Sequence, residues 1–122
     1  MRVLAVDTAT EACSAALLVG EEVIERYEVL GRGHAERLLP MVQEVLAEGG
    51  VALAALDAIA FGRGPGGFTG LRIAAGVTQG LAYGAGLPVA PVSTLAALAA
   101  RGATRHGRRH LLACLDARMA EV

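Results

Sequence analysis

A glycine-rich loop, GRGPGGFTG at residues 62–70, has the composition that most directly suggests chemistry in this sequence. Gly62, Gly64 and Gly67 match the pattern G-x-G-x-x-G of dinucleotide-binding loops. Glycine lets a backbone approach a ligand closely, and a helix that begins after such a loop favours an anion at its N-terminus. The loop is therefore either a phosphate-facing turn or a tight connection between a strand and a helix.

Two classes of nucleotide-binding loop are excluded by the residues that follow. A dinucleotide fold needs an acidic residue about 20 positions later to hold the ribose, but the next acidic residue in the chain is Asp116. A Walker A loop needs a lysine followed by Ser or Thr, and the chain contains no lysine. Neither class fits residues 62–70.

Histidine and cysteine residues offer little for a metal site. His106 and His110 have the spacing H-x-x-x-H, but they lie in the cationic stretch RHGRRH with no third ligand nearby. Cys13 and Cys114 each lie in an apolar run, and two cysteines alone do not make a zinc site. We expect a solvated loop, buried thiols in a reducing cytoplasm, and no stoichiometric metal.

The pattern of apolar residues predicts an α/β fold with a mixed sheet. Strands are expected at 2–8, 12–19, 22–30, 56–61, 87–91 and 110–116, and helices at 34–48, 68–84 and 94–101. The first three strands are joined by short turns, so they should be antiparallel neighbours. Pro40 should kink the first helix or mark its true first turn, and two glycines at 49–50 should end it. Alternating helices and strands follow the three antiparallel strands.

Length and charge set further limits. A chain of 122 residues is expected to be one domain. Residues 58–115 contain six arginines and no acidic residue, whereas residues 1–57 contain ten acidic residues and four arginines. A surface that meets an anionic partner would explain this asymmetry, and so would burial of most of the segment. No secretory signal or membrane-spanning run is apparent, so we expect a cytoplasmic protein without membrane contact.

The second predicted helix carries glycine at every fourth position. Gly76, Gly80 and Gly84 would form a stripe that permits close approach by another helix. Apolar side chains occupy nearly all of the remaining circumference: Leu71, Ile73, Ala74, Ala75, Val77 and Leu81. Such a helix is either fully buried or shared with a partner.

Four segments together resemble a known family. AVDTATEACSAAL, GHAERLLP, GRGPGGFTGLRIAAGVTQGLA and LDARMAEV are similar to the N-terminal half of the bacterial TsaB (YeaZ) family of tRNA threonylcarbamoyladenosine biosynthesis proteins. The resemblance covers essentially all 122 residues, and its most specific part is the proline- and glycine-rich loop followed by FTGLR. The family usually has serine where this chain has Gly67, and Ser or Thr where it has Ala35, so those hydroxyls are not needed here.

The resemblance implies a fold and a candidate ligand site. The fold is that of the actin, sugar-kinase and Hsp70 superfamily, with residues 1–122 forming a single lobe of a two-lobe protein. In that superfamily the first hairpin approaches nucleotide phosphates. The candidate phosphate-facing residues are Asp7, Thr8, Thr10, Gly64, Gly66 and Gly67. At most a weak or vestigial site for ATP or ADP with Mg²⁺ is implied in the full complex, and a structural role for Asp7 in a turn stays open.

The resemblance also implies a role without catalysis. The related TsaD transfers a threonylcarbamoyl group to N6 of adenosine 37 in tRNA and binds a metal through an H-x-x-x-H pair. Thr94 and Leu98 stand at those positions here, and neither is a good ligand. We therefore expect a non-catalytic scaffold or activator subunit for TsaD, in a complex that also contains the ATPase TsaE. Whether tRNA touches this lobe is left open.

A protein interface is the expected functional surface. In the resembling family the first two helices pair with those of TsaD, or of a second copy, in a four-helix contact. We predict that helices 34–48 and 68–84 pack side by side and present one surface to TsaD, or to a second copy in a homodimer when the protein is alone. The predicted interface residues are His34, Leu38, Val42, Leu71, Arg72, Ala75, Gly76 and Gln79.

The alternative function is enzymatic. One form is a nucleotide-dependent phosphotransferase or ATPase, which needs the second lobe and a second phosphate loop. The other is a glycoprotease-like metallopeptidase, which needs a set of metal ligands that the sequence does not bring together.

Overall fold

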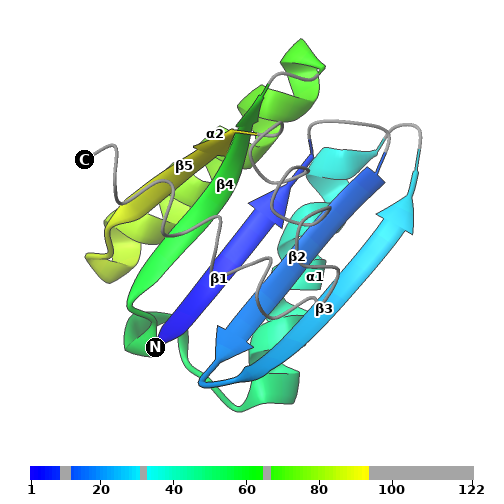
Figure 1. The fold of residues 1–122 in the computed structure, drawn as a ribbon. Helices are drawn as coiled ribbons and strands as arrows, with labels where there is room; N and C mark the ends of the chain where they lie inside the picture. The colour runs from blue at the N-terminus through cyan, green and yellow to red at the C-terminus, as the bar shows by residue number, and fades with distance from the viewer. Residues whose placement is uncertain (9–11, 31–32, 65–66, 94–122) are drawn as a thin grey trace.

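The computed structural model describes residues 1–8, 12–30, 33–64 and 67–93. A five-stranded sheet has two long helices on one face (Figure 1). In chain order the elements are β1 (Arg2–Asp7), β2 (Ala12–Val19), β3 (Glu22–Val29), α1 (His34–Gly49), the 3₁₀ turn η1 (Leu53–Ala55), β4 (Ala58–Gly64), α2 (Phe68–Ala85) and β5 (Val89–Ser93). The predicted helix 94–101 and strand 110–116 lie outside the described residues.

The strand order is β3-β2-β1-β4-β5. The pairs β1–β2 and β2–β3 are antiparallel, as the short turns predicted, whereas β4 is parallel to both β1 and β5. The crossover from β4 to β5 runs through α2, which is the usual way to join parallel strands. The predicted mixed sheet is therefore confirmed over the described strands.

Alternation along the central strands divides the core between the two faces of the sheet. Leu4 pairs with Leu17, and both side chains point toward the helices, where they join a cluster with Val45 and Ile59. The opposite face buries a smaller cluster that includes Val3 and Leu18. Both faces of the sheet therefore contain completely buried aliphatic side chains.

The C-terminal end of α1 and its internal proline test two of the sequence predictions. Gly50 ends the helix at φ 65°, a left-handed conformation that glycine adopts without steric cost, and its amide donates to the carbonyl of Ala47. This confirms the predicted stop. Pro40 lies inside a helix that begins at His34, so the prediction that it might mark the first turn is wrong. The helix tolerates it although the ring removes one backbone donor.

The fourth strand extends further than the sequence predicted. Strand β4 continues to Gly64, so Gly62 and Gly64 belong to the sheet and not to a free loop. The pairing of β4 with β5 is irregular between these two glycines, and Gly64 has φ 107°. The connection to α2 is consequently shorter than the nine-residue glycine-rich stretch suggested.

Candidate functional site

The first candidate site lies at the carboxyl ends of β1 and β4. Parallel pairing of these strands places Val6 beside Phe61 and so brings Asp7 close to Gly62. A Cβ atom at Gly62 would lie 2.9 Å from Cγ of Asp7 and 2.9 Å from its Oδ2. The carboxylate of Asp7 therefore occupies the space that any larger residue at position 62 would need.

Ser14 joins this corner from the other neighbouring strand. It stands opposite Asp7 in the antiparallel register of β1 and β2, so the two side chains point to the same face of the sheet. That face is the one opposite the helices. Sequence reasoning missed Ser14, although the predicted hairpin register could have indicated it.

Thr8 has a different role from the one expected. Its side chain is buried, and its hydroxyl donates a hydrogen bond to the carbonyl of Gly70 in the first turn of α2. The hydroxyl thus joins the end of β1 to the start of α2, and the expectation that it faces a phosphate is wrong. The physical reason is that α2 begins directly over the end of β1.

The glycines of the corner are only partly described. Gly64 is buried within the sheet, and Gly67 is the exposed N-cap residue just before α2, with its carbonyl accepting from the amide of Leu71. Thr10 and Gly66 lie outside the described residues. Within the described ranges, no group of three or more His, Cys, Asp or Glu residues is placed to hold a metal ion.

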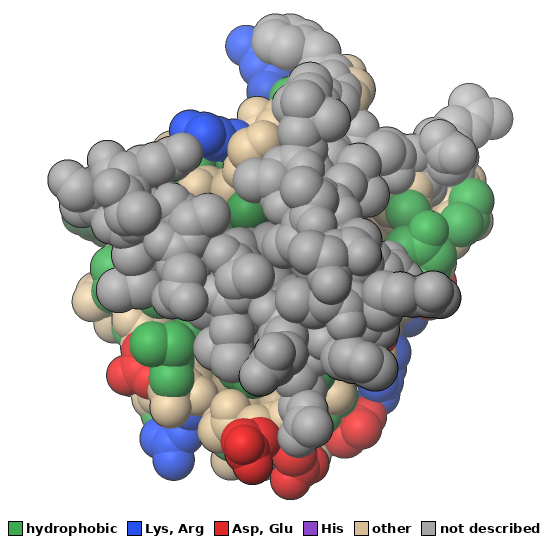
Figure 2. Space-filling view, viewed as in Figure 1, with side chains coloured by type: hydrophobic (Ala, Val, Ile, Leu, Met, Phe, Trp, Pro, Cys, Tyr) green, Lys and Arg blue, Asp and Glu red, His purple; other side chains and the backbone are tan. Residues whose placement is uncertain are grey.

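Charge is distributed unevenly along the strand direction. In the view of Figure 2, Asp and Glu side chains gather at the lower edge, with a basic side chain beside them at the lower left. Arg63 and Arg72 are exposed, and they lie near the opposite end, at the carboxyl end of β4 and in the first turns of α2. The described part of the acid-free segment therefore places its two arginines toward the end of the sheet at which β4 finishes and α2 begins.

The outer surfaces of the helices form the second candidate site. Helix α1 covers β2 and β3, α2 covers β4, and the two helices contact each other on the same face of the sheet. Three predicted interface residues are not on this surface, and two of them are almost completely buried: Leu38 is 0% exposed and Val42 is 1% exposed. The prediction that they face a partner is wrong, because the apolar stripe of an amphipathic helix packs onto its own sheet. His34 is also buried.

Helix α2 places several of the other predicted residues at its surface. Its inner side buries Ala74, Thr78 and Ala82 against the sheet, while Leu71 and Ala75 are half-buried at the boundary. The residues exposed on the outer side include Arg72, Gly76, Gln79, Gly80, Tyr83 and Gly84. None of the described helices is long and apolar enough to cross a membrane.

Two features of this outer side bear on binding. A Cβ atom built at Gly76, Gly80 or Gly84 would meet nothing within 4 Å, so the glycine stripe faces open space. Tyr83 is 93% exposed, the most of any large hydrophobic side chain in the described part of the chain. Sequence reasoning missed Tyr83, although its spacing from Arg72, Gly76 and Gln79 places it on the same side of the helix.

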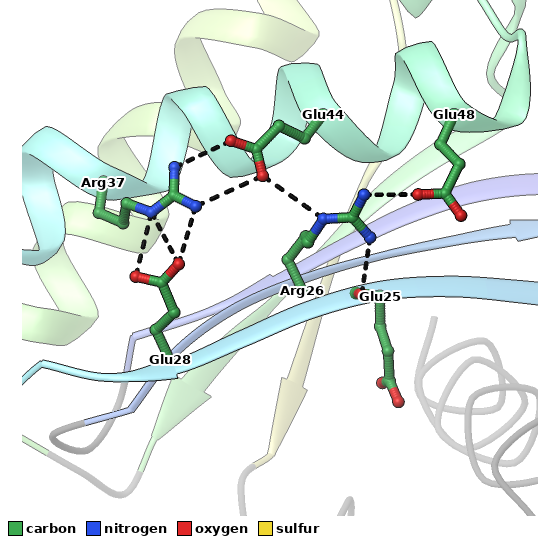
Figure 3. Close-up of polar contacts among 6 residues, drawn as sticks. All are labelled: Glu25, Arg26, Glu28, Arg37, Glu44 and Glu48. Atoms are coloured by element: carbon green, nitrogen blue, oxygen red, sulfur yellow. Dashed lines mark hydrogen bonds and ion pairs between the residues drawn. The ribbon is translucent and has the colours of Figure 1, made fainter.

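An ion-pair ladder holds α1 to the edge strand β3 (Figure 3). The Nε of Arg37 donates to both carboxylate oxygens of Glu28 on β3, at 3.0 and 3.1 Å. Its Nη1 donates to Glu44, two turns further along α1, at 3.0 Å. Glu44 also pairs with Arg26, which in turn pairs with Glu48. The hydrogen bonds from Arg37 hold the pKa values of Glu28 and Glu44 below their ordinary value. The ladder holds α1 to the sheet, and none of its residues lies on the outer side of α2.

Known proteins match this chain over most of its length. The family model described as TsaD, tRNA N6-adenosine threonylcarbamoyltransferase, matches residues 19–122. TsaB, a tRNA threonylcarbamoyladenosine biosynthesis protein, is 51% identical over 122 residues in both Haemophilus influenzae and Escherichia coli. These matches cover 100% of this chain but 52% and 53% of those proteins. The chain thus spans about half the length of the curated relatives it matches.

A solved structure gives the same result in three dimensions. YeaZ from Pseudomonas aeruginosa has a TM-score of 0.82 and 59% sequence identity, with coverage of 87% of this chain and 50% of that chain. The mixed sheet and the family match confirm the predicted fold of the actin, sugar-kinase and Hsp70 type. The chain belongs to the TsaD family, and over its whole length it is similar to about half of TsaB, the tRNA threonylcarbamoyladenosine biosynthesis protein.

Proposed function

We propose that this chain forms one lobe of a non-catalytic scaffold subunit in tRNA threonylcarbamoyladenosine biosynthesis. The lobe binds a catalytic TsaD subunit through the outer side of α2 and thereby supports the transfer of a threonylcarbamoyl group to N6 of adenosine 37 in tRNA. The ATPase TsaE joins the assembled complex, which works in the cytoplasm. The names of the related proteins support the pathway.

The exposed glycine stripe of α2 is the observation that carries the proposal. Glycine in a helix interior costs about 0.5–1 kcal/mol relative to alanine. No contact inside the described lobe requires glycine at positions 76, 80 or 84, because an added Cβ meets open space there. Close approach by a helix of another subunit would account for glycine at all three positions, because only a residue without a Cβ atom lets two helix backbones come into contact.

Substitution of Gly76 tests the proposal. Gly76→Arg puts a long charged side chain on an exposed position, so the lobe folds, but in a dry helix contact the unpaired charge costs several kcal/mol of association. Gly76 is a better site for this test than Ala75, which is half-buried in the lobe itself.

The measurement is the affinity of the full-length protein for TsaD by titration calorimetry, with circular dichroism as a check on folding. Tyr27→Arg is the matched control, since Tyr27 is 65% exposed on the edge strand and points away from the helices. We expect Gly76→Arg to weaken binding at least 100-fold and Tyr27→Arg to leave it unchanged. Normal TsaD binding by a folded Gly76→Arg protein would refute the docking surface.

A second candidate function is weak binding of ATP or ADP with Mg²⁺ at the Asp7 corner. The position of the Asp7 carboxylate beside Gly62, at the carboxyl end of β1, favours it, because a carboxylate is a ligand that Mg²⁺ prefers. Thr8 is not included in this site, since its side chain is buried and its hydroxyl donates to the carbonyl of Gly70. Asp7→Asn should abolish any Mg²⁺-dependent nucleotide binding to the full-length protein, measured by calorimetry with and without Mg²⁺. Unchanged binding would exclude this corner.

A further inference from the structure

Thr8 connects the end of β1 to α2 through a buried polar contact. Its side chain is 1% exposed, and its hydroxyl donates to the carbonyl of Gly70 in the first turn of the helix. Helix α2 packs mainly over β4, and β1 is the neighbouring strand and the central one of the sheet (Figure 1). The hydrogen bond therefore ties the start of α2 to the middle of the sheet.

The apolar surface of α2 does not by itself specify how the helix is turned about its axis. Mainly apolar residues run from Ile73 around to Ala75, and at about 100° per residue they cover an arc of about 200°. A helix that packs on a sheet needs a stripe of only about 100°. The most deeply buried residues of the arc are small: Ala74, Thr78 and Ala82. Several rotations of the helix would therefore bury a similar apolar area.

We infer that Thr8 is a positioning residue that sets the rotation of α2, and with it the direction in which the outer side of α2 faces TsaD. The inference rests on the proposed docking surface and names a residue outside that surface that determines its geometry. A hydrogen bond is directional, and its loss is costly where water cannot replace it. Only rotations that keep the Gly70 carbonyl within reach of Thr8 are retained. Thr78, whose buried hydroxyl has no partner, supplies no such restraint further along the helix.

A small rotation of α2 is enough to disturb a close helix contact. A helix with its side chains is about 10–12 Å across, so a roll of about 20° displaces its surface residues by about 2 Å. Exposed residues such as Gly76 and Gln79 would shift by that distance relative to a partner helix. Interface cores are packed as closely as protein interiors, so they do not tolerate such a displacement. Thr8 thus affects TsaD binding although its own side chain is almost completely buried.

Removal of the Thr8 hydroxyl tests this role. Thr8→Val keeps the shape of the side chain and loses the donor, whereas Thr8→Ser keeps the donor. By titration calorimetry of the full-length protein, we expect Thr8→Val to weaken TsaD binding at least tenfold and Thr8→Ser to change it by less than about threefold. If Thr8→Val does not fold, Thr8→Ala and Thr8→Ser make the same comparison, because they differ only in the hydroxyl. Equal affinity of the folded proteins with and without the hydroxyl would overturn the inference.

Thr78→Val is the matched control for a change in the buried layer. Thr78 is also 1% exposed and lies in the same helix, but its hydroxyl makes no hydrogen bond. We expect Thr78→Val to leave the affinity for TsaD unchanged. A loss of affinity as large as that of Thr8→Val would overturn the inference, because any change in this layer would then have the same effect.

The rotation of α2 can be measured without TsaD. Residual dipolar couplings of the α2 amides vary periodically along a helix, and the phase of that variation reports how the helix is turned about its axis. We expect the phase to shift in full-length Thr8→Val and to stay the same in Thr8→Ser and Thr78→Val. An unchanged phase in Thr8→Val would also overturn the positioning role.

The two proposals fail in different ways. If Gly76→Arg prevents TsaD binding while Thr8→Val neither weakens binding nor turns α2, the positioning role is wrong and the docking surface stands. If Gly76→Arg binds TsaD normally while the couplings show that Thr8→Val turns α2, Thr8 sets the rotation of the helix and the TsaD docking surface lies elsewhere.

Discussion

Thr78 places a polar atom inside the apolar layer between α2 and the sheet. Its side chain is 1% exposed, and its hydroxyl oxygen has no hydrogen-bond partner. A buried polar group without a partner loses its hydration and gains nothing in return. Thr8, the other buried threonine in the described part of the chain, is bonded to Gly70. The two threonines therefore contribute to stability in opposite directions.

We expect Thr78→Val to raise the free energy of unfolding by about 1 kcal/mol, because the substitution keeps the shape of the side chain and removes the unsatisfied oxygen. Urea denaturation of the full-length protein measures this. Thr69→Val in the same helix is the control, since Thr69 is exposed and its change should stay within about 0.5 kcal/mol. A loss of stability in Thr78→Val would mean that the hydroxyl is hydrogen-bonded in solution.

The contact between α1 and β3 shows how one element is fixed to another. Arg37 lies between Glu28 on the strand and Glu44 on the helix, and hydrogen bonding lowers the pKa of both carboxyl groups. A carboxyl group whose pKa is depressed by folding stabilises the folded state above its unfolded pKa. That contribution is lost as the pH falls through the depressed value.

This linkage predicts a pH-dependent effect of Arg37→Gln. The difference in unfolding free energy between the original protein and the variant should be largest at neutral pH. It should begin to shrink as the pH falls below the ordinary value of 4.5 for these carboxyl groups, and vanish once both are protonated. Urea denaturation across that pH range provides the measurement. A difference that is independent of pH would show that Arg37 acts through packing alone.

Glycine substitutions within α2 and at the end of α1 should change the free energy of unfolding in opposite directions. Gly80→Ala should raise the free energy of unfolding by about 0.5–1 kcal/mol, because the helix gains propensity and the new methyl meets nothing within 4 Å. Gly50→Ala should lower it, because Gly50 ends α1 at φ 65°, where a Cβ is strained. Thermal and chemical unfolding of the two variants measure this contrast. Destabilisation by Gly80→Ala would show that α2 is covered within its own chain.

At the scale of the whole molecule, the sheet is buried on both faces although the described helices cover only one. Leu17 and Leu18 are neighbours on β2 that point to opposite faces, and both are 0% exposed. The face that holds Leu18 is therefore as much a part of the protein's core as the helical face. It also carries Asp7, the last residue of β1.

We accordingly expect Leu18→Ala to cost about 2–5 kcal/mol of unfolding free energy, as much as Leu17→Ala, because each leaves a cavity in a closely packed layer. Val29→Ala on the edge strand, which is 66% exposed, should cost less than about 0.5 kcal/mol. Denaturant titration of the three variants of the full-length protein gives the comparison. A small effect of Leu18→Ala would mean that this face is covered only loosely.

The sequence alone was sufficient for most of the secondary structure. Short turns and alternating residues predicted the three antiparallel strands to within about two residues, and periodicity with terminal glycines predicted both helices, because these signals depend on neighbours in the chain. The start of β4 and its extension to Gly64 were predicted less well. A strand through Gly62 is held by pairing with β1 and β5, which no local pattern contains.

The sites depended on contacts between distant parts of the chain. The family resemblance identified the Asp7 corner and the helical surface, but only the register of β1 with β4 placed the carboxylate of Asp7 against Gly62. Periodicity identified the apolar stripe of α1, yet only packing showed that Leu38 and Val42 face the sheet. The ion pair between Glu28 and Arg37 and the exposure of Tyr83 likewise depend on how the helices pack on the sheet. Local signals determine which elements form; burial and strand register decide which side chains remain to meet a partner.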